Sequence, residues 1–107
     1  MPSPSRVAGL EALREKNPEN TLTLLMLANE YFKEGRWSDT VAVLRDYLAR
    51  ANDEGAAYRL LARSLRSLDD EEAARAAFLQ GAAAARAHGH TGMAEEFEQE
   101  AARPTAG

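Results

Sequence analysis

Apolar residues recur at helical spacing along most of the chain, in stretches that polar turns separate. They form a broad band from Leu22 to Phe32, and narrower stripes begin at Val41 and at Ala57. Intervals of three and four residues place such side chains on one face of an α-helix. The pattern predicts six helices, over residues 5–16, 20–34, 38–51, 55–67, 70–88 and 92–102.

The turns between these stretches carry residues that commonly end or begin helices. Gly35 follows the second stretch, where glycine takes the left-handed conformation at the end of a helix. Ser38 or Asp39 is expected to cap the third helix, and Asp69 or Asp70 the fifth. Each turn is short, which favours antiparallel neighbouring helices.

The same periodicity indicates which side chains are buried. In the first helix Val7, Leu10 and Leu13 recur at helical spacing. In the fifth helix, which is dominated by alanine, the residues expected to face inward are Ala74, Phe78, Gly81, Ala82 and Ala85. Small side chains at these positions allow helices to approach closely, although each buries less apolar area than leucine would.

The middle of the chain contains two consecutive copies of one helical hairpin, and matching residues of the two copies are separated by a constant number of positions without a gap. Residues that recur with this offset are Leu27 as Leu61, Ala28 as Ala62, Ala42 as Ala76, Leu44 as Phe78 and Ala49 as Ala83. A constant period of this length is typical of solenoids built from stacked helical units. The first helix resembles the second half of a truncated unit, and the last helix an amphipathic cap with an acidic outer face.

Composition narrows the classes of function. The 107 residues are 45% hydrophobic and 28% charged, as in an ordinary globular domain, so we expect a single domain at 5–102 with flexible ends at 1–4 and 103–107. A net charge of −4 disfavours nucleic-acid backbones and anionic membrane surfaces as partners. The chain contains no cysteine, which excludes disulfides and thiolate chemistry. Neither a signal peptide nor a membrane span is evident, so cytoplasmic residence is expected.

The repeated unit resembles the tetratricopeptide repeat (TPR) family, whose 34-residue pattern is W-x2-L-G-x2-Y, then A-x3-F, then P. The slots of that pattern are held by Leu24, Leu27, Ala28, Tyr31, Thr40, Leu44 and Asn52 in the first copy, and by Tyr58, Leu61, Ala62, Leu65, Ala74, Phe78 and Arg86 in the second. The resemblance implies an all-α fold, a short right-handed α-solenoid of antiparallel helix pairs with about six helices.

The resemblance also implies a function, because proteins of this family are adaptors that hold a peptide in a concave groove. Carried onto this chain, the family geometry directs two sets of side chains into the groove. They are Leu22, Leu25, Asn29 and Phe32 from the first unit, and Ala56, Arg59, Arg63 and Arg66 from the second. The partner expected is a protein or peptide, and the arginines favour an acidic one.

Two interpretations of the arginines remain open. Arg59, Arg63 and Arg66 lie four and three residues apart on one helix, where like charges repel. Guanidinium groups in this arrangement suit the carboxylates of an acidic peptide. Alternatively the face is merely solvated, or it is neutralised within the chain by Glu30 or by the acidic last helix.

Other classes of function have less support in the sequence. A self-associating subunit, such as a homodimer, is the alternative to a peptide-binding adaptor, since two repeats bury little area. We expect no enzyme, because no nucleophile and base stand in a recognisable spacing. We expect no cofactor and no metal: His88 and His90 lie in a glycine turn without a set of carboxylates. Trp37 is expected to pack at the hairpin turn.

Overall fold

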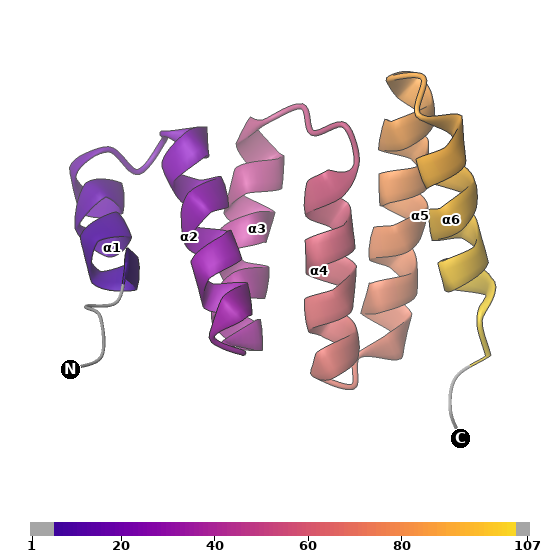
Figure 1. The fold of residues 1–107 in the computed structure, drawn as a ribbon, viewed down its shortest axis with the longest axis horizontal. Coiled ribbons are helices and arrows are strands. Elements are labelled where there is room, and N and C mark those ends of the chain that lie inside the picture. The colour runs from indigo at the N-terminus through magenta and orange to yellow at the C-terminus, as the bar shows by residue number, and fades with distance from the viewer. Residues whose placement is uncertain (1–5, 105–107) are drawn as a thin grey trace. The chain divides into compact units, whose positions relative to one another are not determined.

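The computed structural model describes residues 6–104, and within this range the regular secondary structure is α-helix alone (Figure 1). The helices are α1 (Arg6–Lys16), α2 (Thr21–Lys33), α3 (Trp37–Arg50), α4 (Ala56–Ser67), α5 (Glu71–Ala87) and α6 (Thr91–Ala102). The all-α fold of paired helices is thus confirmed. Of the flexible ends expected at 1–4 and 103–107, all but Arg103 and Pro104 lie outside the described residues, and the flexibility of both ends stays a prediction.

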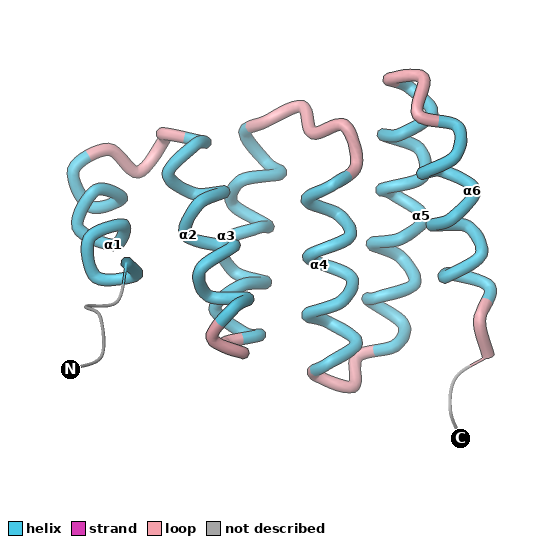
Figure 2. The backbone as a smooth tube through the Cα atoms, viewed as in Figure 1, coloured by secondary structure: helices cyan, strands magenta, loops and turns pink. Residues whose placement is uncertain are grey.

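The described residues form two compact units, which divide between Ala51 and Asn52. The first contains α1, α2 and α3, with α2 packed against both of the others. The second contains α4, α5 and α6, with α5 packed against both of its neighbours. Short turns join the helices inside each unit (Figure 2). The single domain expected at 5–102 stays a prediction.

The first unit is built on the broad apolar band of α2. Its buried apolar side chains are Val7, Leu10, Leu24, Leu27, Ala28, Tyr31, Val43, Leu44 and Tyr47. Thr40 is also fully buried, and its hydroxyl donates to the carbonyl of Arg36 at 2.7 Å. This bond removes the cost of burying a hydroxyl group in the core.

Of the three apolar residues that recur at helical spacing in the first helix, Val7 and Leu10 are buried, whereas the Leu13 side chain is 52% exposed. The helix α1 packs chiefly against α2, so only the narrow face that carries Val7 and Leu10 is covered. A helix with one neighbour buries a narrower stripe than a helix with two.

Polar contacts attach α1 to the rest of the first unit. The Tyr31 hydroxyl donates to the Glu11 carboxylate at 2.6 Å, and Arg14 pairs with Asp46 of α3 at 3.1 Å. Burial, together with the Glu11 carboxylate, raises the pKa of Tyr31 to about 12. The phenol therefore remains protonated, and able to donate this bond, throughout the neutral range.

Three helices end in the same type of turn, with a residue in the left-handed conformation. These residues are Gly35 (φ 71°), Asp69 (φ 61°) and Gly89 (φ 79°). In each turn the next residue donates its N–H to the carbonyl five positions earlier, as in Arg36 to Tyr31 at 2.9 Å. This is the Schellman arrangement, which satisfies carbonyls that the helix end leaves unpaired. Gly35 and Asp69 hold the same place in the two copies of the hairpin, so the turn repeats with the sequence.

The helix caps follow the prediction at one of two places. Asp70 accepts a hydrogen bond from the N–H of Ala73 at 3.2 Å and caps α5 as expected. The cap expected from Ser38 or Asp39 is wrong, because α3 already begins at Trp37 and its N-cap residue, Arg36, makes no side-chain cap bond. Asp39 instead pairs with the Arg36 guanidinium at 2.9 Å.

The second unit depends on a close approach of its three helices at Gly81. A Cβ atom at this position would lie 2.7 Å from the Cβ of Tyr58 in α4 and 2.8 Å from the Phe97 ring in α6. Phe97 is fully buried, and its ring centroid lies 5.7 Å from that of Phe78. All five residues of α5 that were expected to face inward are buried, which confirms that prediction.

At two corresponding positions of the repeated hairpin, the two units carry side chains of very different size. Tyr47 of α3 holds the place in the first copy of the hairpin that Gly81 of α5 holds in the second. Leu24 of α2 corresponds in the same way to Tyr58 of α4. The first unit therefore places its larger residue on the second helix of the hairpin, whereas the second unit places it on the first. Exchanging bulk between facing positions keeps the filled volume similar.

We predict opposite effects for alanine at two helical glycines. Gly81→Ala should lower the free energy of unfolding by about 1–3 kcal/mol, because the methyl group overlaps Tyr58 and Phe97. Gly9→Ala in α1 has nothing within 4 Å and should raise it by about 0.5–1 kcal/mol. Urea denaturation measures both, and a stabilised Gly81→Ala variant would contradict the packing described for α5.

Candidate protein-interaction surface

The three arginines of α4 share one face of that helix but differ in their exposure and contacts. Arg59 and Arg66 are half-buried along one flank, whereas Arg63 is exposed. Since a helix has 3.6 residues per turn, the step of four residues from Arg59 to Arg63 exceeds a full turn, and the step of three from Arg63 to Arg66 falls short of one. Arg63 is therefore rotated away from the line that joins Arg59 and Arg66. The flank with Arg59 and Arg66 faces the acidic helix α6, since both side chains bond to it.

Arg59 is held by two groups of α6. Its guanidinium donates to the carboxylate of Glu96 and lies 5.1 Å from the centroid of the Phe97 ring. Arginine stacked on an aromatic face keeps its planar edge free for a carboxylate. The contact therefore combines one cation–π interaction with one charge-assisted hydrogen bond.

Arg66 is bound more extensively than Arg59. It pairs with Glu100 of α6 at 3.0 Å and with Glu71 at the start of α5 at 3.4 Å. Another of its nitrogens donates to the backbone carbonyl of Glu100 at 3.4 Å, and the guanidinium lies 5.1 Å from the centroid of the Phe78 ring. Since the last carbonyls of a helix lack partners within it, Arg66 also serves as a cap for α6.

Two further arginines reinforce the C-terminal end of α6. Arg75 of α5 donates to the carbonyl of Ala101 at 3.0 Å, and Arg103 pairs with Glu100 at 2.9 Å. Hydrogen bonds from Arg103 and from Arg66 hold the pKa of the Glu100 carboxyl below its ordinary value. The negative end of the α6 dipole thus lies among positive side chains.

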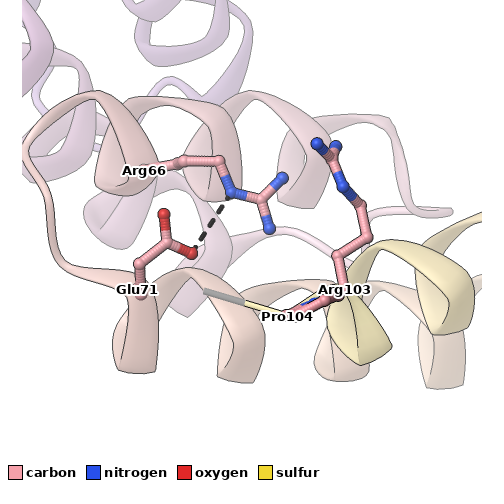
Figure 3. Close-up of a pocket in the computed structure, with 4 residues that line it drawn as sticks. All are labelled: Arg66, Glu71, Arg103 and Pro104. Carbon is pink, nitrogen blue, oxygen red and sulfur yellow. Dashed lines mark hydrogen bonds and ion pairs between the residues drawn. The ribbon is translucent and has the colours of Figure 1, made fainter. Parts of the chain in front are cut away.

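A pocket of about 160 Å³ opens beside this cluster, lined by Arg66, Glu71, Arg103 and Pro104 (Figure 3). Both guanidinium groups are already paired, Arg66 with Glu71 and Glu100, and Arg103 with Glu100. Two arginines and two glutamates leave no net charge for a bound anion. The pocket therefore lacks the uncompensated charge that would favour a carboxylate or phosphate.

Arg63 differs from the other two arginines of α4. Its side chain is exposed and forms no hydrogen bond or ion pair with any residue in 6–104. Internal neutralisation by the last helix, one of the two open interpretations, holds for Arg59 and Arg66. Glu30, the other suggested neutralising residue, pairs instead with Arg6 at 3.3 Å and Lys33 at 3.4 Å.

The candidate residues of α2 present a partly apolar surface. Leu22 is 65% exposed, whereas Leu25 and Phe32 are half-buried. Asn29 is exposed, and its amide donates to the Leu25 carbonyl at 2.9 Å, which leaves its side-chain oxygen available to a partner. Phe32 packs edge-on against Trp37 with centroids 5.2 Å apart, so Trp37 lies at the hairpin turn as expected.

Met26 belongs to the same surface, although it was not among the residues expected from the sequence. Its side chain is 36% exposed, and it stands one turn after Leu22 and one turn before Asn29 on the outward face of α2. The interval of four residues from Leu22 is the signal that could have identified it. Leu22, Met26 and Asn29 thus form one exposed strip on α2. Whether this strip and the α4 arginines line one groove stays a prediction.

The two histidines form polar contacts at and near the turn between α5 and α6. His88 contacts the carbonyl of Ala84 through Nδ1 at 2.9 Å, and His90 Nε2 lies 3.2 Å from the Glu54 carboxylate. Within residues 6–104 there is no group of three or more His, Cys, Asp or Glu side chains that could hold a metal ion. Among the same residues, no helix has the length and apolar character needed to cross a bilayer.

Comparison with solved structures places the fold. A crystal structure of MamA, a protein with a TPR-like fold, matches with a TM-score of 0.62 at 18% sequence identity, over 89% of this chain and 64% of that chain. The chain has a TPR-like helical repeat fold. It spans less than two thirds of the MamA chain. No protein-family model and no curated protein matches it.

The Glu100 cluster predicts a pH dependence of stability. The folded-state pKa of Glu100 lies below the ordinary value of 4.5, so its contribution is fully present above about pH 4.5 and is lost as the pH falls through the folded-state pKa. Glu100→Gln should lower the free energy of unfolding at pH 7 by up to about 1 kcal/mol, and its difference from the wild type should shrink below pH 4.5.

Urea denaturation between pH 3 and pH 7 checks this prediction. The matched control is Glu95→Gln, on the same helix, because Glu95 is exposed and forms no ion pair within 4 Å among residues 6–104. A difference between Glu100→Gln and the wild type that stays constant with pH would show that the carboxylate charge does not stabilise the fold.

Proposed function

We propose that this chain is a non-catalytic protein-interaction module for a peptide or protein segment, with an exposed strip on α2 in the first unit and the exposed Arg63 on α4 in the second unit as separate candidate contacts. The observation that supports the proposal most is the exposed strip of Leu22, Met26 and Asn29, an apolar surface with an amide on a helix that otherwise packs tightly. Exposed apolar side chains grouped on one face are typical of binding surfaces.

Each exposed group suits a particular part of a partner. Leucine and methionine offer an adaptable apolar contact, and the free oxygen of the Asn29 amide can accept a hydrogen bond from a peptide N–H. Arg63 is the arginine of α4 that keeps its donors available, so it can pair with a carboxylate. We therefore propose an acidic partner in which one carboxylate, rather than a run of them, contacts α4.

The fold neighbour supports only the general part of this proposal. Helical repeats of the TPR type commonly present such surfaces to other proteins, but fold alone does not define function. The remainder rests on the exposed residues of this chain. The cytoplasmic location expected from the sequence stays a prediction.

A peptide titration followed by NMR tests the proposal. Isotope-labelled protein is mixed with a set of acidic and C-terminal peptides, and saturable shifts are expected at Leu22, Met26, Asn29 and Arg63. Leu22→Glu and Arg63→Glu should each weaken the binding about tenfold, since one removes an apolar contact and the other reverses the charge that meets a carboxylate.

Arg45→Glu provides the matched control, because Arg45 is an exposed arginine of α3 without an ion pair among residues 6–104. It should change the affinity less than twofold, since it lies outside the proposed surface. Equal weakening by Arg45→Glu and Arg63→Glu would show that the binding depends on the net charge of the protein and not on a specific contact with Arg63. Absence of saturable shifts across the peptide set would overturn the proposal.

A further inference from the structure

The outward face of α5 carries a pattern that the proposed function does not use. The exposed residues along it follow intervals of four, three, four and three, and they are Glu72, Ala76, Leu79, Ala83 and Arg86. Such alternation is the spacing of a helix seam that packs against a second helix. Among the described residues of the second unit, α4 and α6 pack against the buried sides of α5, so this exposed seam has no neighbouring helix there.

Leu79 is the unusual residue of this seam. Its side chain is 51% exposed, although the same position of the first unit is held by the charged residue Arg45. The residues flanking it on the seam, Ala76 and Ala83, have small side chains that let a second helix approach to the short end of the usual range of about 8–10 Å between axes. A leucine between two alanines therefore offers a flat surface with one central projection.

The charges of the seam are arranged symmetrically about Leu79. Glu72 stands seven residues before it and Arg86 seven residues after it. If a second copy of α5 lies antiparallel on this face, Leu79 meets Leu79 of the second copy, and each Glu72 comes opposite Arg86 of the other chain. Residues that complement their own symmetry mates are what a two-fold interface requires. Antiparallel helices also bring opposite dipole ends together.

Glu72 and Arg86 are both able to form an ion pair with a second chain. Glu72 is exposed and forms no ion pair within 4 Å among residues 6–104. Arg86 already donates to Glu98 of α6 at 2.6 Å, but through one of its terminal nitrogens only, and its side chain remains 47% exposed. A guanidinium group has five N–H donors, so it can bind a carboxylate of a second chain while it keeps Glu98.

We propose that two copies of this chain associate through the α5 seam, with antiparallel α5 helices and with Leu79 at the two-fold axis. The seam shares no residue with the proposed partner-binding contacts, because Leu22, Met26, Asn29 and Arg63 lie on α2 and α4. A contact made by one helix from each chain is small, so the dimer belongs to the weak class that depends on concentration.

Sedimentation equilibrium from about 10 µM to about 1 mM protein at low salt tests the association. The apparent mass of the wild type should rise from 11.7 kDa toward twice that value. Leu79→Glu places two carboxylates together at the axis and should weaken the association at least tenfold. Leu22→Glu is the matched control for loss of an exposed leucine, and it should associate like the wild type while it loses peptide binding.

A wild type that stays monomeric at the highest concentration, or a Leu79→Glu variant that associates as well as the wild type, would overturn the proposal. Neither result would affect the peptide-binding surface, whose loss is measured separately with Leu22→Glu and Arg63→Glu.

Charge exchange tests the antiparallel register. Glu72→Arg places like charges opposite each other at both ends of the seam, and Arg86→Glu does the same with opposite sign, so each variant alone should self-associate at least tenfold more weakly than the wild type. An equimolar mixture of the two should associate again, because both opposing pairs are then of opposite charge. Circular dichroism checks that each variant is folded. A mixture no more associated than its components would contradict the pairing of Glu72 with Arg86.

The register can also be tested without reversing a charge. Because the chain has no cysteine, Leu79→Cys introduces a single thiol at the proposed axis. Mild oxidation should join two copies at least tenfold faster than in Leu22→Cys, whose position is more exposed. Equal rates would show that the seam does not bring the two Leu79 positions together.

Discussion

The close approach of three helices at Gly81 is the constraint on which the second unit depends. With no side chain at this position, Tyr58 and Phe97 reach the backbone of α5 from two sides. Phe97 is then completely buried, which fixes α6 against α5. Since an alanine would place a methyl group at 2.7 Å from Tyr58 and 2.8 Å from Phe97, no larger residue fits without moving a helix.

The position of α6 determines the electrostatics of α4. Once Phe97 is seated, Glu96 lies over Arg59 and Glu100 over Arg66, and the repulsion expected among the arginines is relieved within the chain. The acidic helix α6 thus forms ion pairs with two arginines that an acidic partner would otherwise contact. Arg63 keeps its charge exposed, so the chemistry open to a partner at α4 is one cation rather than a basic patch.

Much of the fold could be predicted from the sequence, because it rests on local and periodic signals. The constant offset between the two copies of the hairpin predicted paired helices, and it reappears in the left-handed residues Gly35 and Asp69. The inward face of α5 followed from helical spacing alone. The exposure of Leu13 could not be predicted this way, since it depends on how many helices contact α1.

The candidate site was less predictable than the fold. Its decisive contacts join residues far apart in the chain, such as Arg59 and Glu96, which are 37 positions apart. Spacing within α4 shows that Arg59 and Arg63 lack acidic neighbours of their own, but only the packing of α6 shows which arginines are paired. Met26 was missed for another reason, because a broad apolar band does not reveal which of its members remain outside the core.

The most direct test of the pairing between α4 and α6 is the exchange of arginine guanidinium protons with water, measured by NMR on protein with labelled arginine side chains. We predict slow exchange and restricted rotation for Arg59 and Arg66, which α6 holds, and fast exchange with free rotation for Arg63. Glu96→Gln with Glu100→Gln should release the first two and leave the third unchanged. Equal behaviour of all three arginines in the wild type would contradict the neutralisation of α4 by α6.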